Sequence, residues 1–214
     1  HFVTEGSGRR GLTWDKPGDI TGDVEVSALV KKSKGDKGVM FQLHLQGSGK
    51  ASSENSYYLD VTNSGNIRIN RNRNGGFTVL KSTSIPFTPE LDTWYEAVFK
   101  REGSTLKGKV WSYGEEEPAE WQIEVEDDSF ITGKVGIGHV TTEITNEWAF
   151  FGVGTNDAEA PRAPKDVIVD KTPLELKIEE IESMLDESEF TLESLENVQN
   201  ALENARKLLE KSDV

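Results

Sequence analysis

Residues 57–70 read YYLDVTNSGNIRIN, and this stretch decides the fold. Every second residue in its two ends is apolar, and the turn-forming residues NSGN separate the ends. Strict alternation places one set of side chains on each face of a β-strand. A short turn rich in Gly and Asn between two such runs is typical of a β-hairpin. The stretch therefore predicts two antiparallel strands with one apolar face.

The same alternation recurs on both sides of this hairpin, up to about residue 155. Clusters of Gly, Asn, Asp or Pro interrupt it at intervals typical of a sandwich or barrel. No helical stripe lies among these runs, so the chain is predicted to be mainly β, with an antiparallel β-sandwich (jelly roll) as its main domain. The further strands are expected at residues 24–30, 39–46, 76–81, 94–101, 105–112, 120–125, 134–140 and 148–154.

The pattern changes after residue 157. Prolines at 161 and 164 indicate a semi-rigid linker over residues 158–171. Thr172, Pro173 and Glu175 form the start signal of a helix, and Thr191 begins a second. Apolar residues then repeat at helical spacing. The domains expected are thus a jelly roll at 1–157 and a C-terminal α-helical hairpin at 172–214, whose helices pack on each other, on the sandwich or on a third helix.

Charge and composition exclude several classes of partner and chemistry. The chain holds 38 acidic and 24 basic residues, a formal net charge of −14. Nucleic acid binding needs a basic surface, so nucleic acid is not expected as a partner. No apolar run approaches the ~20 residues of a membrane helix, so membrane insertion is not expected. The absence of cysteine excludes disulfides, thiolate zinc sites and thiol nucleophiles.

One part of the sequence resembles a known family. The motif residues are Trp94-Tyr95, Gly103, Lys109-Val110-Trp111, Gly114, Glu117-Pro118, Trp121-Gln122 and Gly133 to Gly136. With them, residues 20–155 resemble concanavalin A-like and laminin-G-like jelly-roll modules of bacterial extracellular proteins. The resemblance implies a secreted protein, located outside the cell or on its surface.

A second set of motif residues lies near the C-terminus, at Leu185, Glu189-Phe190-Thr191, Ala201-Leu202 and Ala205. With them, residues 173–214 resemble part of a FIVAR domain, a small helical bundle of cell-surface proteins and large glycan-acting enzymes. The resemblance covers two helices, and it implies a spacer or an attachment role.

A candidate ligand surface follows from the polar side of three predicted strands. If these strands are neighbours, their polar residues lie on one sheet face. Aromatic rings stack on sugars, and amides, acids and guanidinium groups bind sugar hydroxyls. The alternative is an ordinary solvated face, which antiparallel sheets commonly have. Trp111 is added as a stacking platform, although packing is its other expected role. The candidate residues are Gln42, His44, Gln46, Tyr58, Asp60, Arg68, Asn70 and Trp111.

Calcium is the one cofactor that the sequence suggests, in a structural role. Asp19, Asp23, Asn156 and Asp157 are oxygen donors in loops near the two ends of the predicted sandwich. In the family that the chain resembles, the closing strand often carries an acid that helps to bind calcium. This chain has Ala149 in that position.

Catalysis is not expected. Glycosidases of this fold commonly carry a Glu-x-Asp-x-x-Glu strand, which this sequence lacks, and there is no Gly-x-Ser-x-Gly elbow. The leading hypothesis is a non-catalytic carbohydrate-binding or adhesion accessory module of a larger exported bacterial protein. Its partners would be a polysaccharide or glycan and other domains of the same chain. The alternatives are a structural spacer without a ligand and, third, a glycan-cleaving domain.

Overall fold

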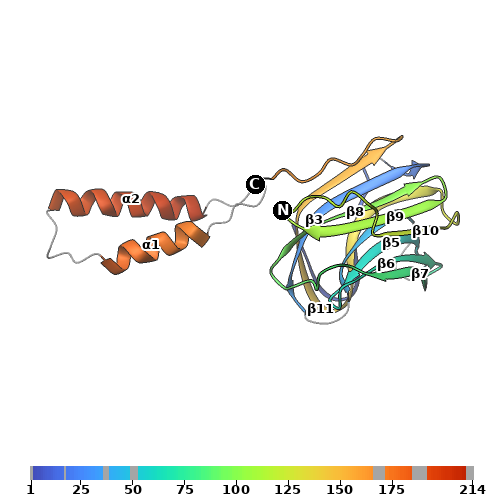
Figure 1. Cartoon of the computed structure of the whole chain (residues 1–214), viewed down its shortest axis with the longest axis horizontal. Coiled ribbons are helices and arrows are strands. Elements are labelled where there is room, and N and C mark those ends of the chain that lie inside the picture. Colours follow the sequence, from blue (N-terminus) through green and yellow to red (C-terminus); the bar gives the residue numbers. More distant parts are fainter. Residues whose placement is uncertain are drawn as a thin grey trace. The chain divides into compact units, whose positions relative to one another are not determined.

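The computed structural model describes residues 2–16, 18–35, 39–48, 53–165, 172–184 and 192–210. The chain divides into two compact units, His1–Pro164 and Lys165–Val214. The first unit contains the strands and the second the helices (Figure 1).

The strands of the first unit form one continuous antiparallel sheet. Its order is β10-β9-β8-β3-β11-β4-β5-β6-β7, and β1 and β2 both pair with β11. The strands are β1 (Phe2–Trp14), β2 (Ile20–Thr21), β3 (Val24–Lys34), β4 (Val39–Ser48), β5 (Asn55–Thr62), β6 (Asn66–Arg73), β7 (Gly76–Ser84), β8 (Trp94–Glu102), β9 (Thr105–Ser112), β10 (Ile123–Glu126) and β11 (Thr132–Thr155).

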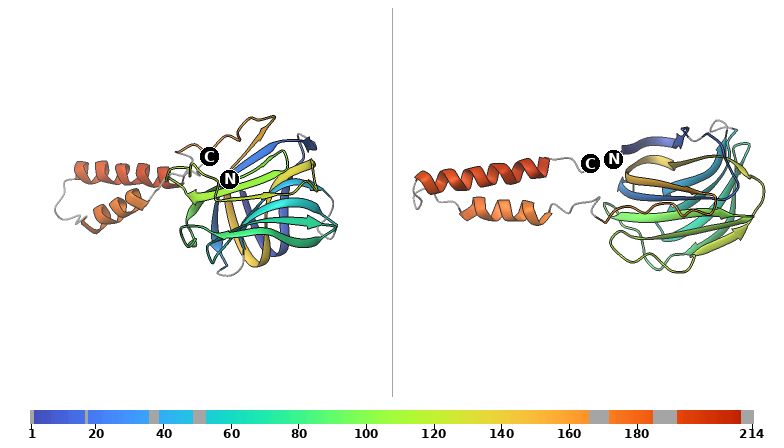
Figure 2. Two further views of the ribbon diagram at one scale, coloured as in Figure 1. Left: turned by 45° about the vertical axis from the view of Figure 1, so that its right-hand side comes forward. Right: turned by 90° about the horizontal axis from the view of Figure 1, so that it is seen from above.

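The long strand β11 turns this sheet into a sandwich. Its first part pairs with β4, and its last part pairs with β3. Register shifts next to Asn146 and between Trp148 and Phe150 interrupt its pairing with β3, and such bulges bend a strand. The sheet therefore folds over on itself, and contacts between β6 and β9 and between β4 and β8 join the two layers. Figure 2 shows these two curved layers facing each other.

The apolar side of each alternating strand lines the space between the layers. Val26, Leu43, Leu59, Ile69 and Phe99 are all buried in one core cluster. The predicted mainly β sandwich with a helical end is therefore confirmed. Burial of such side chains stabilises the fold by about 25 cal/mol per Å² of apolar surface removed from water.

β1, β2 and β11 differ from the predicted set, and the two-residue strand β2 lies outside every range expected from the sequence. β1 was not expected, because its sequence FVTEGSGRRGLTW has three glycines and no sustained alternation. The two strands expected at 134–140 and 148–154 are parts of the single strand β11. Trp148 lies in the second half of this strand, is 0% exposed, and makes an edge-to-face contact with Phe41.

The helical unit consists of α1 (Thr172–Met184) and α2 (Leu192–Glu210). The two helices contact each other, and an ion pair joins Arg206 to Glu182. Between them runs an apolar groove of about 360 Å³ with Ile178, Ile181 and Leu202 in its wall. No helix in the described part of the chain is both long and apolar enough to cross a membrane.

The first unit extends past the expected boundary at residue 157. Residues 158–164, here called the strap, follow β11 and hydrogen-bond to the sandwich. The Ser27 hydroxyl donates to the Pro161 carbonyl at 2.5 Å, and the Tyr113 hydroxyl donates to that of Pro164 at 2.8 Å. The first half of the predicted linker is therefore an ordered part of the sandwich.

Candidate functional site

The outer side of β4, β5 and β6 carries a continuous set of polar side chains, most of them buried, which we call the polar face. Strand register forms it: Gln42 pairs with Asp60 and Asp60 with Arg68, while His44 pairs with Tyr58 and Tyr58 with Asn70. The next row pairs Ser56 with Asn72. The side chain of Gln46, the remaining candidate on β4, is outside the described residues. The polar face thus consists of Gln42, His44, Ser56, Tyr58, Asp60, Arg68, Asn70 and Asn72.

An ion pair occupies one end of the polar face. Arg68 Nε and Nη2 donate to the two carboxylate oxygens of Asp60 at 2.6 and 2.8 Å. Burial raises the pKa of Asp60, although hydrogen bonds from Arg68, Asn70 and Gln42 oppose this change. Hydrogen bonding to Asp60 in turn raises the pKa of Arg68. This two-pronged geometry fixes the guanidinium plane and holds Arg68 on the face.

A second carboxylate, that of Glu54, organises the other end. It accepts hydrogen bonds from the Ser56 hydroxyl at 2.8 Å and from Asn72 Nδ2 at 3.2 Å. His44 Nδ1 lies 3.3 Å from Glu54 Oε1. The sequence interpretation missed Glu54, Ser56 and Asn72. The alternation of Tyr58 and Asn70, extended by two residues, would have found the latter two.

An aromatic row crosses the same face. The Tyr58 ring stacks on the His44 ring at 5.4 Å between centroids, and on the Phe77 ring at 6.0 Å. Phe77 comes from β7, whose register places it opposite Asn72. Tyr58 is buried, whereas Phe77 is 50% exposed. The row therefore presents one accessible aromatic side chain beside a set of polar groups.

Trp111 does not belong to this group. It lies on β9, in the other layer of the sandwich, next to Glu96 on β8, and it is 5% exposed. Its strand neighbour Val110 points into the core, so Trp111 is on the outer side of that layer. The candidate residues therefore divide between two layers.

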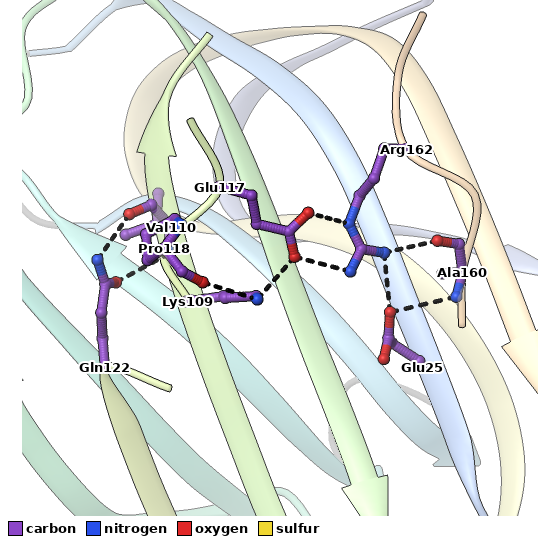
Figure 3. Close-up of polar contacts among 8 residues, drawn as sticks. All are labelled: Glu25, Lys109, Val110, Glu117, Pro118, Gln122, Ala160 and Arg162. Atoms are coloured by element: carbon purple, nitrogen blue, oxygen red, sulfur yellow. Dashed lines mark hydrogen bonds and ion pairs between the residues drawn. The ribbon is translucent and has the colours of Figure 1, made fainter. Parts of the chain in front are cut away.

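A second polar cluster holds the strap on the outer side of β3 and β9. Figure 3 shows Arg162 between two carboxylates: its Nη1 donates to Glu25 at 2.8 Å, and its Nε and Nη2 donate to Glu117 at 2.8 and 2.9 Å. Lys109 Nζ lies 2.6 Å from Glu117 and donates to the Pro118 carbonyl. The Ala160 amide also donates to Glu25.

The charges of this cluster stabilise the contact between the strap and the sandwich. Burial works to raise the pKa of Glu117, but hydrogen bonds from Arg162 and Lys109 outweigh it and lower the pKa below its usual value. Burial works to lower the pKa of Arg162. The hydrogen bonds and charges of Glu117 and Glu25 outweigh this effect, so the pKa of Arg162 is raised. A Cβ on Gly154 would lie 2.1 Å from the Ala158 carbonyl oxygen, so glycine permits this close approach.

The predicted calcium ligands are dispersed over several loops. Asp23 Oδ1 accepts a hydrogen bond from the Gly103 amide at 2.8 Å. Asn156 and Asp157 form an exposed turn with φ of 54° and 67° after β11, and Asp19 is exposed before β2. In the described part of the chain, no three His, Cys, Asp or Glu side chains gather as a metal site would require. The three aspartates among the predicted ligands therefore do not gather in one cluster.

Three solved structures are similar to this chain. The carbohydrate binding module CBM66 from Bacillus subtilis has 15% sequence identity and a TM-score of 0.59, covering 72% of this chain and 86% of its own. The exoplasmic/lumenal domain of VIP36 in its Ca²⁺/Man3GlcNAc-bound form has 13% identity and a TM-score of 0.50, covering 78% and 82%.

The Ca²⁺-bound form of VIP36 has 11% identity and a TM-score of 0.52, and it covers 74% of this chain and 84% of its own. No family model matches the sequence, and no curated protein does. At these identities the likeness concerns the fold alone, and it supports the description of the sandwich above as a jelly roll.

Proposed function

We propose that this chain is a non-catalytic carbohydrate-binding module that holds a larger exported protein on a glycan through its polar face. The observation that carries the proposal is the aromatic row His44–Tyr58–Phe77 beside the Asp60–Arg68 ion pair. A pyranose ring has apolar C–H faces and a rim of hydroxyls. Stacking on an aromatic side chain and hydrogen bonding to fixed polar groups complement both parts.

The comparisons support the proposal at the level of the fold, since the similar structures include a carbohydrate-binding module and a domain solved with bound Man3GlcNAc. Absence of catalysis belongs to the proposal, as do secretion, a bacterial parent protein and a FIVAR-like spacer role for residues 172–214. Calcium stays a prediction. The dispersed positions of Asp19, Asp23, Asn156 and Asp157 argue against a site made by these residues.

A glycan array tests the proposal. The whole chain is applied with and without calcium, and binding to a defined group of glycans is expected in both conditions. Tyr58→Ala removes the central ring of the aromatic row and is expected to abolish the signal. Tyr113→Ala is the matched control, because Tyr113 lies beyond β9 in the other layer and contacts the strap. Circular dichroism spectra confirm that both variants fold.

Two results would contradict the proposal. An array without any signal would favour a structural spacer that recognises nothing. Equal loss of binding in both variants would show that the signal depends on overall stability and not on the polar face.

A further inference from the structure

The polar face has an excess of hydrogen-bond acceptors. Gln42 Oε1, His44 Nε2, Asn70 Oδ1 and Asn72 Oδ1 are buried and have no partner among the described side chains. All four belong to one face, on three neighbouring strands. A buried polar atom left without a partner costs about 1–3 kcal/mol, so a set of four on one surface requires an explanation.

The two carboxylates determine which polar atoms have no hydrogen-bond partner. The amide group of Gln42 hydrogen-bonds Asp60, and Asn72 Nδ2 donates to Glu54. Asn70 Nδ2 donates to the carbonyls of Tyr58 and Arg68 at 3.4 and 3.5 Å. Because every amide nitrogen faces an acceptor, each amide oxygen is the atom without a partner.

The imidazole of His44 follows the same rule. Its Nδ1 faces Glu54 Oε1 at 3.3 Å, so this nitrogen carries the ring proton of the neutral form. In this neutral form Nε2 carries a lone pair and is a hydrogen-bond acceptor. All four atoms without a partner are therefore acceptors, and their complement is a group of hydrogen-bond donors.

The charges of the polar face further restrict which ligands could pair with these acceptors. Two carboxylates, Asp60 and Glu54, stand beside a single guanidinium, and Arg68 uses Nε and Nη2 on Asp60. A sulfate or carboxylate on a ligand offers acceptors and no donors, and it would meet like charge. A neutral sugar hydroxyl offers a donor at no electrostatic cost.

We infer that the polar face selects sugars that donate hydroxyl hydrogen bonds and carry no negative charge. This inference rests on the function proposed above. The acceptors are buried in the free protein, so neighbouring side chains must shift when a ligand enters. Arg68 and Phe77, the more exposed members of the site, are the ones to move, since rotamer changes at binding surfaces are common.

Matched pairs of ligands test the inference. The whole chain is titrated calorimetrically with neutral oligosaccharides from the array and with their sulfated or uronic acid counterparts. The neutral member of each pair is expected to bind at least about tenfold more tightly.

Asp60→Asn removes one negative charge from the face, while its amide oxygen still accepts from Arg68. It is expected to reduce the preference for the neutral member severalfold. The control is Glu116→Gln, an equal charge change in an exposed turn, and it should leave the preference unchanged.

The possible failures can be told apart. Equal or tighter binding of the anionic members by the unmodified chain would overturn the inference and leave the proposed function standing. A preference that Asp60→Asn does not alter, or that Glu116→Gln alters equally, would also overturn it. Absence of binding to every neutral and anionic member would overturn the proposed function, and the inference with it.

Discussion

Replacing Arg162 by Met is expected to destabilise the sandwich strongly. Arg162 is the cation that contacts both Glu25 and Glu117 from the strap. Glu25 is only 2% exposed, so the substitution leaves a buried carboxylate without its guanidinium. Breaking a buried pair in this way typically costs about 3–5 kcal/mol. The side chain of Arg162 is 24% exposed, and the solvent it reaches lowers the expected loss to about 2–3 kcal/mol.

Urea unfolding of the whole chain, followed by tryptophan fluorescence, measures this loss. Arg162→Lys keeps the positive charge but loses the two-pronged geometry. Its stability should therefore lie between that of the unmodified chain and that of Arg162→Met. In Glu25→Gln/Arg162→Met the unpaired charge is gone, so the double variant should recover part of the stability, as a double-mutant cycle would show. A loss below about 0.5 kcal/mol for Arg162→Met, within the range of ordinary surface substitutions, would refute the reasoning.

Two predictions concern pH. Because the pKa of Glu117 is lowered in the folded state, its stabilising effect is present above the ordinary glutamate value of about 4.3 and is lost as pH falls below it. Urea midpoints measured downward from pH 5 should therefore fall more for the unmodified chain than for Glu117→Gln, and parallel curves would contradict this. Burial and the carboxylate of Asp127 raise the pKa of Tyr57 to about 12. The contribution of Tyr57 to folding stability is therefore present below pH 10 and is lost between pH 10 and 12. Absorbance at 295 nm should show a late titration step that Tyr57→Phe removes. Titration of all four tyrosines near pH 10 in the folded protein would refute the assignment.

Alternation along the strands was enough to predict the sandwich and most of the polar face. A period of two assigns each residue to a face without knowledge of the partner strand. This is why Gln42, Tyr58 and Arg68 were expected on one side, and why Leu43 and Leu59 were expected in the core. Neighbouring strands in a hairpin then brought the three polar rows together.

The remaining parts of the site depend on contacts between distant residues. The sequence does not show that Phe77 faces Tyr58, because their stacking results from the register of β6 and β7. Arg162 meets Glu25 across 137 positions of sequence. A proline-containing segment such as residues 158–164 resembles a linker in composition, and only the packing of β3 and β9 reveals its role.

The central claim is that the polar face and its aromatic row bind glycans, and Phe77→Ala tests it most directly. Phe77 is half exposed, so its loss should leave the fold intact and remove the accessible ring of the row. Ile131→Ala, which trims another apolar side chain of similar exposure at 55%, is the control. Calorimetric titration with the glycan that gives the strongest array signal should show binding weakened by about tenfold, since stacking of rings contributes about 0.5–1.5 kcal/mol beyond the area it buries and 1.4 kcal/mol is tenfold. Unchanged affinity in Phe77→Ala, or equal weakening in Ile131→Ala, would contradict the claim.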